Sequence, residues 1–168
     1  MPPQQTRAAR HRMFDHYLHT AREAAALTSS RLLLSLASAA DGARAEEFAG
    51  DTAKATAWFA AEQAVLLATV EQAAAHRYDV HTWQLSWSMG HHLHWRGLWR
   101  EKEAVRRAAV DAACRLGDRT AQGHAHDGLT LATGDLGCPV PHPVRRAVCP
   151  ATVWRGVFPV VRASRPRP

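Results

Sequence analysis

The sequence predicts an all-α fold of antiparallel helical hairpins, followed by a disordered C-terminal tail. Ala, Leu, Glu, Gln and Arg dominate residues 1–137, and these residue types favour helices. No proline occurs between Pro3 and Pro139, and no alternating strand pattern persists in this stretch. The length of 168 residues allows one domain at most, or a piece of a larger one.

The first predicted helix covers about residues 7–27. Met13, Tyr17, Ala21 and Ala24 recur at three- and four-residue spacing and form one apolar stripe. Residues 28–30 are expected to be either the stop of this helix or a cap. Residues 31–50 favour no element, but they contain two turn signals, Asp41-Gly42 and Gly50-Asp51.

The second predicted helix begins at a cap formed by Asp51 or Thr52 and continues to about His76. Its apolar residues fall into two adjoining rows. The first row is Trp58, Ala61, Val65, Ala68 and Gln72, and the second is Phe59, Leu66 and Val70.

Three further helices are expected over residues 80–96, 99–116 and 119–136, and Gly97, Gly117 and Gly137 end them. The connections have two to four residues, which requires neighbouring helices to be antiparallel. Trp83 and Trp87 lie one turn apart, and we expect them to fill the core between helices.

Charge divides the chain at Cys138. Residues 1–137 hold 15 basic and 15 acidic side chains, whereas residues 138–168 hold six arginines, no acid and seven of the nine prolines. Such a segment cannot continue the helices, so we expect disorder. It offers an alternative function, binding of nucleic acid or an anionic membrane through arginine, with Trp154 and Phe158 available to stack on bases.

Gly97 and Gly137 lie 40 residues apart, a period typical of helical-hairpin repeats. The residues around Gly97 resemble a tetratricopeptide repeat, with Met89-Gly90, Leu93 and Gly97-Leu98-Trp99 in the positions of its first helix and turn. A second copy follows the same order, with Leu129-Thr130, Thr133 and Leu136-Gly137.

A longer resemblance covers about residues 10–137. The run RMFDHYLHTARE is similar to the end of the winged-helix region of STAND-type ATPases, with Met13-Phe14-Asp15 where that family has Met-His-Asp. The runs AWFAAEQAVLLATVEQAA, TWQLSWSM and AACRLGDRTAQGHAH resemble the linker and first tetratricopeptide repeats of SARP/AfsR-like transcriptional regulators.

The resemblance implies three segments: an N-terminal helix and linker over 1–50, a tetratricopeptide-like region over 51–137, and the basic tail over 138–168. Since the chain has no Gly-x-x-x-x-Gly-Lys-Ser/Thr loop, nucleotide hydrolysis is not expected. The hypothesis is a truncated or frameshifted fragment of such a regulator, which acts as a non-catalytic protein–protein interaction module.

The residues predicted to bind a partner are Trp95, Trp99, His91 and His94, around the Gly97 turn. His91 and His94 share a helix face and are an alternative zinc or nickel pair, but no further ligand stands at a diagnostic spacing, so no metal and no cofactor are expected. No nucleophile lies in a recognisable motif, and no catalytic residue is assigned.

The expected partners are protein or peptide segments, or a second copy of the chain, because the last helix lacks a partner helix. No secretory signal or membrane-spanning stretch is recognisable, and three cysteines (Cys114, Cys138 and Cys149) without close spacing suggest free thiols. We therefore expect a cytoplasmic location.

Overall fold

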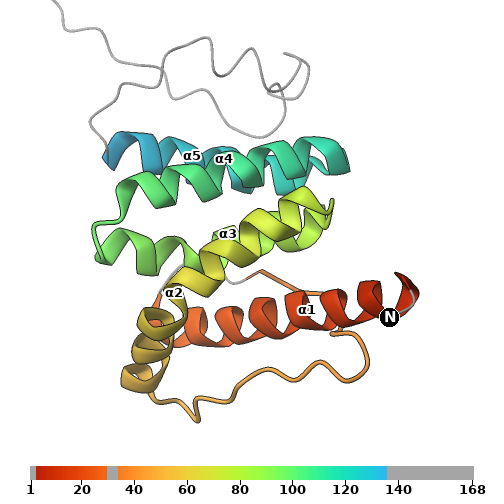
Figure 1. Ribbon diagram of the computed structural model, residues 1–168. Coiled ribbons are helices and arrows are strands. Elements are labelled where there is room, and N and C mark those ends of the chain that lie inside the picture. The colour runs from red at the N-terminus through yellow and green to blue at the C-terminus, as the bar shows by residue number, and fades with distance from the viewer. Residues whose placement is uncertain (1–2, 30–33, 136–168) are drawn as a thin grey trace, which may run out of the picture.

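The computed structural model describes residues 3–29 and 34–135, and within these ranges the chain forms five α-helices and no strand (Figure 1). The all-α prediction is confirmed. The predictions for residues 138–168, including disorder and polyanion binding, lie outside the described residues. The helices are α1 (Pro3–Thr28), α2 (Thr52–Ala75), α3 (Asp79–Trp95), α4 (Trp99–Leu116) and α5 (Arg119–Asp135).

The beginnings of the helices follow local sequence. Asp51 caps α2, and its carboxylate accepts a hydrogen bond from the Lys54 N–H at 3.0 Å. Asp118 acts in the same way before α5, accepting from the Thr120 N–H at 2.8 Å. α1 begins at Pro3, earlier than predicted, because proline suits the first helical position.

Each of the three connections from α2 to α5 contains one residue in the left-handed backbone conformation. Gly97 and Gly117 have φ values of 69° and 67°, and Arg77 takes the same conformation, with φ 62°, although it is not glycine. After α3, the Leu98 N–H donates to the Leu93 carbonyl at 3.0 Å, the bond that closes a Schellman turn. α2 to α5 therefore run antiparallel in sequence order, as predicted (Figure 1).

The segment that begins at Leu34 runs back along α1 as far as Ala40, turns at residues 41–42, and then returns alongside α1 to the start of α2 (Figure 1). Side chains of α1 bind its backbone: the Asp15 carboxylate accepts from the Ala40 N–H at 2.7 Å, and the Thr20 hydroxyl accepts from the Glu46 N–H at 3.0 Å. Phe48 is buried and completes the attachment. The turn predicted at Asp41-Gly42 is present, and the turn signalled by Gly50-Asp51 lies one residue earlier, at residues 49–50.

One apolar core lies between α1, α2 and α3. The predicted stripes are confirmed in part, since Ala21, Ala24 and Trp58 are buried. They are wrong at Met13 and Val65, which are about two-fifths exposed, whereas their neighbours Phe14 and Leu66 are fully buried. The reason is that α2 contacts both α1 and α3, which selects its second row for the core. The members include Leu18, Phe59, Leu66, Val70, Leu85 and Met89.

A second core lies between α3, α4 and α5, and small side chains dominate it. Trp83 is buried there and Trp87 packs beside it, half-buried, as expected of core residues. Leu129 is buried, whereas Leu131 is 42% exposed. The alanines that let these helices approach closely are Ala109, Ala113, Ala121 and Ala125.

Two further features of the described ranges bear on the sequence predictions. None of the helices there has the length and apolar character that a bilayer span needs. Cys114 is half-buried and forms no disulfide bond within the described residues, and the other two cysteines lie outside them.

Candidate functional site

The four predicted partner-binding residues gather at the α3–α4 turn, at the left of Figure 1. Trp95 is the last residue of α3 and Trp99 is the first residue of α4, with the left-handed Gly97 between them. His91 lies one helical turn before Trp95 on α3, and His94 immediately precedes it. We call His91, His94, Trp95 and Trp99 the turn cluster.

Trp95 is the most exposed large apolar residue of the described chain. Its relative exposure is 75%, against 39–42% for the other exposed large apolar residues. The His91 ring lies beside it, with 5.9 Å between ring centroids. An indole combines a large apolar ring with a polar N–H, which is why tryptophan is enriched at protein interfaces.

Trp99 is held more firmly. The His94 ring meets it edge to face at 5.1 Å, and the Lys102 ammonium lies 5.9 Å from its ring centroid. Lys102 Nζ is 3.3 Å from His94 Nδ1. An ammonium group only donates, so the Nδ1 of His94 accepts this hydrogen bond.

The charges around the turn cluster are mainly positive. Arg96 and Arg100 are both exposed, on either side of Gly97, whereas the nearest acidic residue in sequence, Glu101, is half-buried. Lys102 is almost fully buried beneath the rings. The turn therefore presents one exposed indole between cationic side chains.

The histidines of α3 do not converge on a common point. His91 and His94 each face an indole, and the buried His92 points the other way, stacked on Phe59 with ring centroids 5.1 Å apart. His124 of α5 packs against Trp83 and Trp87 instead. This geometry does not favour the alternative zinc or nickel pair at His91 and His94.

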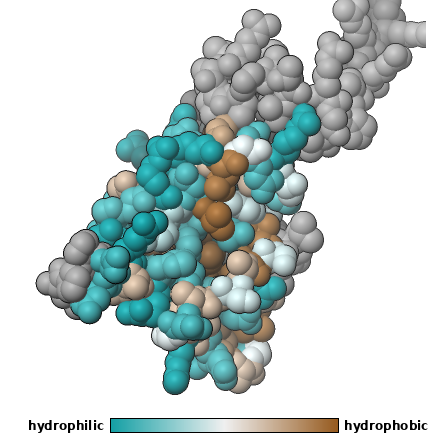
Figure 2. All heavy atoms as spheres, turned by 90° about the vertical axis from the view of Figure 1, so that its right-hand side faces the viewer, coloured by the Kyte–Doolittle hydropathy of each residue, from teal (hydrophilic) through white to brown (hydrophobic). Residues whose placement is uncertain are grey.

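The end of the molecule opposite the turn cluster also carries apolar surface. Figure 2 views that end and shows a hydrophobic strip between hydrophilic side chains. Val80 and Leu116, from the first turn of α3 and the last turn of α4, are about two-fifths exposed. These aliphatic side chains are each less exposed than Trp95.

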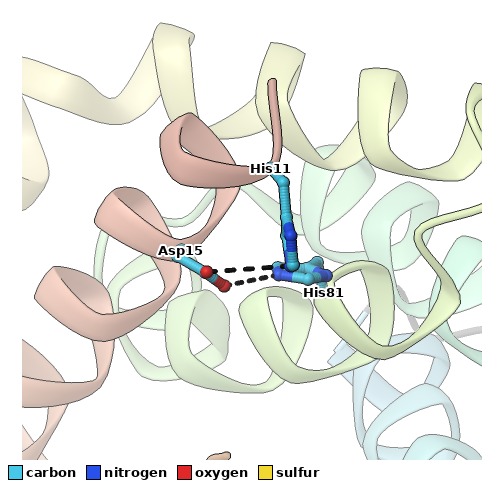
Figure 3. Close-up of side chains that lie close together, drawn as sticks. All are labelled: His11, Asp15 and His81. Carbon is cyan, nitrogen blue, oxygen red and sulfur yellow. Dashed lines mark hydrogen bonds and ion pairs between the residues drawn. The ribbon is translucent and has the colours of Figure 1, made fainter. Parts of the chain in front are cut away.

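A second chemical cluster, which sequence reasoning missed, joins α1 to α3. His81 Nε2 lies 2.7 Å from one Asp15 carboxylate oxygen, and His11 Nε2 lies 3.7 Å from the other (Figure 3). Asp15 and His81 are buried, whereas the His11 side chain is 47% exposed. The i,i+4 spacing of His11 and Asp15 was a local signal, but nothing in the sequence links them to His81.

Burial and hydrogen bonding act in opposite directions on this cluster. Burial raises the pKa of the Asp15 carboxyl, but the Ala40 N–H and the His81 ring outweigh it, and its pKa is lowered. Burial lowers the pKa of His81 more than the Asp15 carboxylate raises it. The pair is therefore an ionised carboxylate and a neutral imidazole at neutral pH.

An open hollow of about 460 Å³ lies next to this cluster. Arg7, Arg10 and Arg77 line it together with Thr6, His76 and Tyr78. The Tyr78 ring also contacts His11, with centroids 5.7 Å apart. Solvent therefore reaches the exposed side of the His11 ring.

The chain matches no family model, no curated protein and no solved structure.

Proposed function

We propose that the chain is a non-catalytic protein–protein interaction module, of the tetratricopeptide-like kind that its sequence resembles, and that the turn cluster binds its partner. The observation that carries the proposal is the exposure of Trp95, at 75%, on an otherwise well-packed hairpin. Tryptophan and arginine are the residue types most enriched among binding hot spots. Trp95, Arg96 and Arg100 supply both types within one turn.

The rigidity of the turn supports this role. The Schellman hydrogen bond between Leu98 and Leu93 fixes the backbone of the turn. The contacts with His94 and Lys102 fix the Trp99 ring, which lies on the other side of the turn from Trp95. A side chain presented from ordered backbone loses less entropy when a partner covers it. The packing around Trp95 therefore suits recognition rather than catalysis.

The charge of the turn indicates the chemistry of the partner. Arg96 and Arg100 are exposed beside the indole, so an acidic segment that also carries an apolar or aromatic side chain complements both features. We assign the partner as such a segment of another protein.

Selection from a displayed peptide library tests the proposal. The wild-type protein is expected to enrich sequences that combine Asp or Glu with an aromatic residue, and Trp95→Ala is expected not to enrich them. Val65→Ala is the matched control, because Val65 is 42% exposed on a different helix. Failure to enrich any sequence, or equal enrichment by Trp95→Ala, would overturn the proposal.

A further inference from the structure

We propose that His11, Asp15 and His81 form a binding site for a divalent transition-metal ion, of which zinc is the representative. Within the described part of the chain, this is the group in which three such side chains place one donor atom each within 4.8 Å of one another. Two imidazole nitrogens and one carboxylate oxygen are a donor set that zinc accepts, with the remaining coordination left to water.

Two helices position the donors. His11 and Asp15 are one turn apart on α1, so both project from the same face, and His81 comes from the first turn of α3 opposite them (Figure 3). The Ala40 N–H binds the Asp15 oxygen that faces His11, at 2.7 Å. This bond is an outer-shell contact that orients a ligand, as in established metal sites.

The present distances are close to those of a coordinated ion. Ligand bonds of about 2.0–2.2 Å in a tetrahedron separate donor atoms by about 3.3 Å. The observed separations are 2.7 Å from His81 to one Asp15 oxygen and 3.7 Å from His11 to the other, and one donor atom from each of the three side chains lies within 4.8 Å of the others. Side-chain adjustments of about one to two ångströms therefore suffice, and the exposed His11 ring can make part of them.

The protonation of the cluster is compatible with binding. A neutral His81 that donates from Nε2 to Asp15 becomes a ligand when its proton moves to Nδ1, with no net loss of a proton. The Asp15 carboxylate supplies the negative charge, and the half-exposed His11 gives the ion a route from solvent. The bound ion would join α1 to α3, where the hydrogen bond between Asp15 and His81 already joins them.

Calorimetric titration of zinc into the metal-free chain at pH 7.5 tests the site. We expect one equivalent to bind, and His11→Ala to weaken the affinity by at least about tenfold, since even outer-shell changes in metal sites cost 10–100-fold. His11 is the preferred variant because its side chain lies at the surface, and Asp15→Asn, which keeps the shape of the buried side chain, is the second.

His76→Ala is the matched control, because it removes an exposed histidine outside the cluster and is expected to leave the affinity unchanged. Cobalt replaces zinc in a parallel experiment, and its visible spectrum is expected to show four-coordinate cobalt in the wild type and to lose it in His11→Ala. Absence of saturable binding, or equal affinity of wild type and His11→Ala, would overturn the proposal. This test does not depend on the turn cluster.

Discussion

His92 shows how a single polar side chain is accommodated in the first core. Its ring stacks on Phe59, and its Nε2 lies 3.2 Å from the Gln63 amide oxygen. Burial, together with the charges of Arg96 and His91, lowers the pKa of His92 below its ordinary value. The folded protein therefore favours the neutral ring.

This lowered pKa predicts a loss of stability in acid. The unfolded chain binds a proton at His92 near pH 6.5, and the folded chain does so only at lower pH. The contribution of His92 is therefore fully present above pH 6.5 and is lost as the pH falls through the lowered pKa of the folded state. Urea denaturation at a series of pH values from 7.5 to about 5 measures the effect.

His92→Gln is the comparison for that experiment, because glutamine can still donate to Gln63 but does not titrate. The free energy of unfolding is expected to fall less steeply with acid in this variant than in the wild type. If the free energy of unfolding fell equally with acid in the wild type and in His92→Gln, His92 would make no contribution to the pH dependence. Other groups, including His81, titrate equally in both proteins.

The residues of the candidate sites were predictable to different extents. Trp95, Trp99, His91 and His94 were predicted because they surround one glycine turn and are neighbours in sequence. The cluster of His11, Asp15 and His81 was missed because 66 residues separate Asp15 from His81. Only the packing of α1 on α3 brings those side chains together.

At the scale of the helices, the glycine turns made the boundaries predictable. Gly97 and Gly117 end α3 and α4, and each has a left-handed φ. The turn after α2 has the same backbone conformation at Arg77, where the sequence offers no glycine to signal it. The buried side of α2 was harder to predict, because Val65 and Leu66 are both apolar and only tertiary contacts choose between them.

Arg77→Gly is therefore expected to stabilise the protein. A non-glycine residue in the left-handed region costs of order 1–3 kcal/mol, and the greater freedom of glycine in the unfolded chain offsets part of the gain. The expected net increase in the free energy of unfolding is about 1 kcal/mol, measured by urea denaturation.

Gly117→Ala is the matched opposite. A Cβ at Gly117 would meet no heavy atom within 4 Å, so only the backbone conformation, with φ 67°, opposes it. We expect a loss of about 1 kcal/mol. If Arg77→Gly destabilised the protein, or Gly117→Ala left it unchanged, the assignment of strain to these turns would be wrong.

At the scale of the whole molecule, one buried arginine lies between three helices. Arg106 of α4 is 1% exposed, and its guanidinium carbon lies 5.3 Å from the Trp87 ring centroid of α3. A Cβ at Gly90 of α3 would lie 1.9 Å from its Nη2, and a Cβ at Gly128 of α5 would lie 2.6 Å from its Nη1. The two glycines therefore make room for the guanidinium between the hairpins.

Gly90→Ala is expected to destabilise the protein by about 1–3 kcal/mol, because the buried guanidinium must move. Arg106→Met removes the obstructing group, and the double variant is expected to lose less than the sum of the two single losses. Arg107→Met is the control, since Arg107 lies on the surface with Glu103 as its partner. If the losses of Gly90→Ala and Arg106→Met simply added in the double variant, the close contact of Gly90 with the Arg106 guanidinium would be contradicted.

The packing of the five helices leaves Trp95 at one end of the molecule, on the outside of a rigid turn. The interaction hypothesis predicts that this indole is the main contact of an acidic partner segment. Val65 offers an exposed apolar side chain elsewhere and serves as a reference for unspecific contact.

The most direct measurement is the dissociation constant of a selected acidic peptide for the wild type, Trp95→Ala and Val65→Ala, determined by calorimetry at one salt concentration. We expect Trp95→Ala to weaken binding by at least about 30-fold, equivalent to a hot spot of about 2 kcal/mol, and Val65→Ala to bind as the wild type does. Equal affinities for wild type and Trp95→Ala would contradict the assignment of the turn cluster as the binding surface.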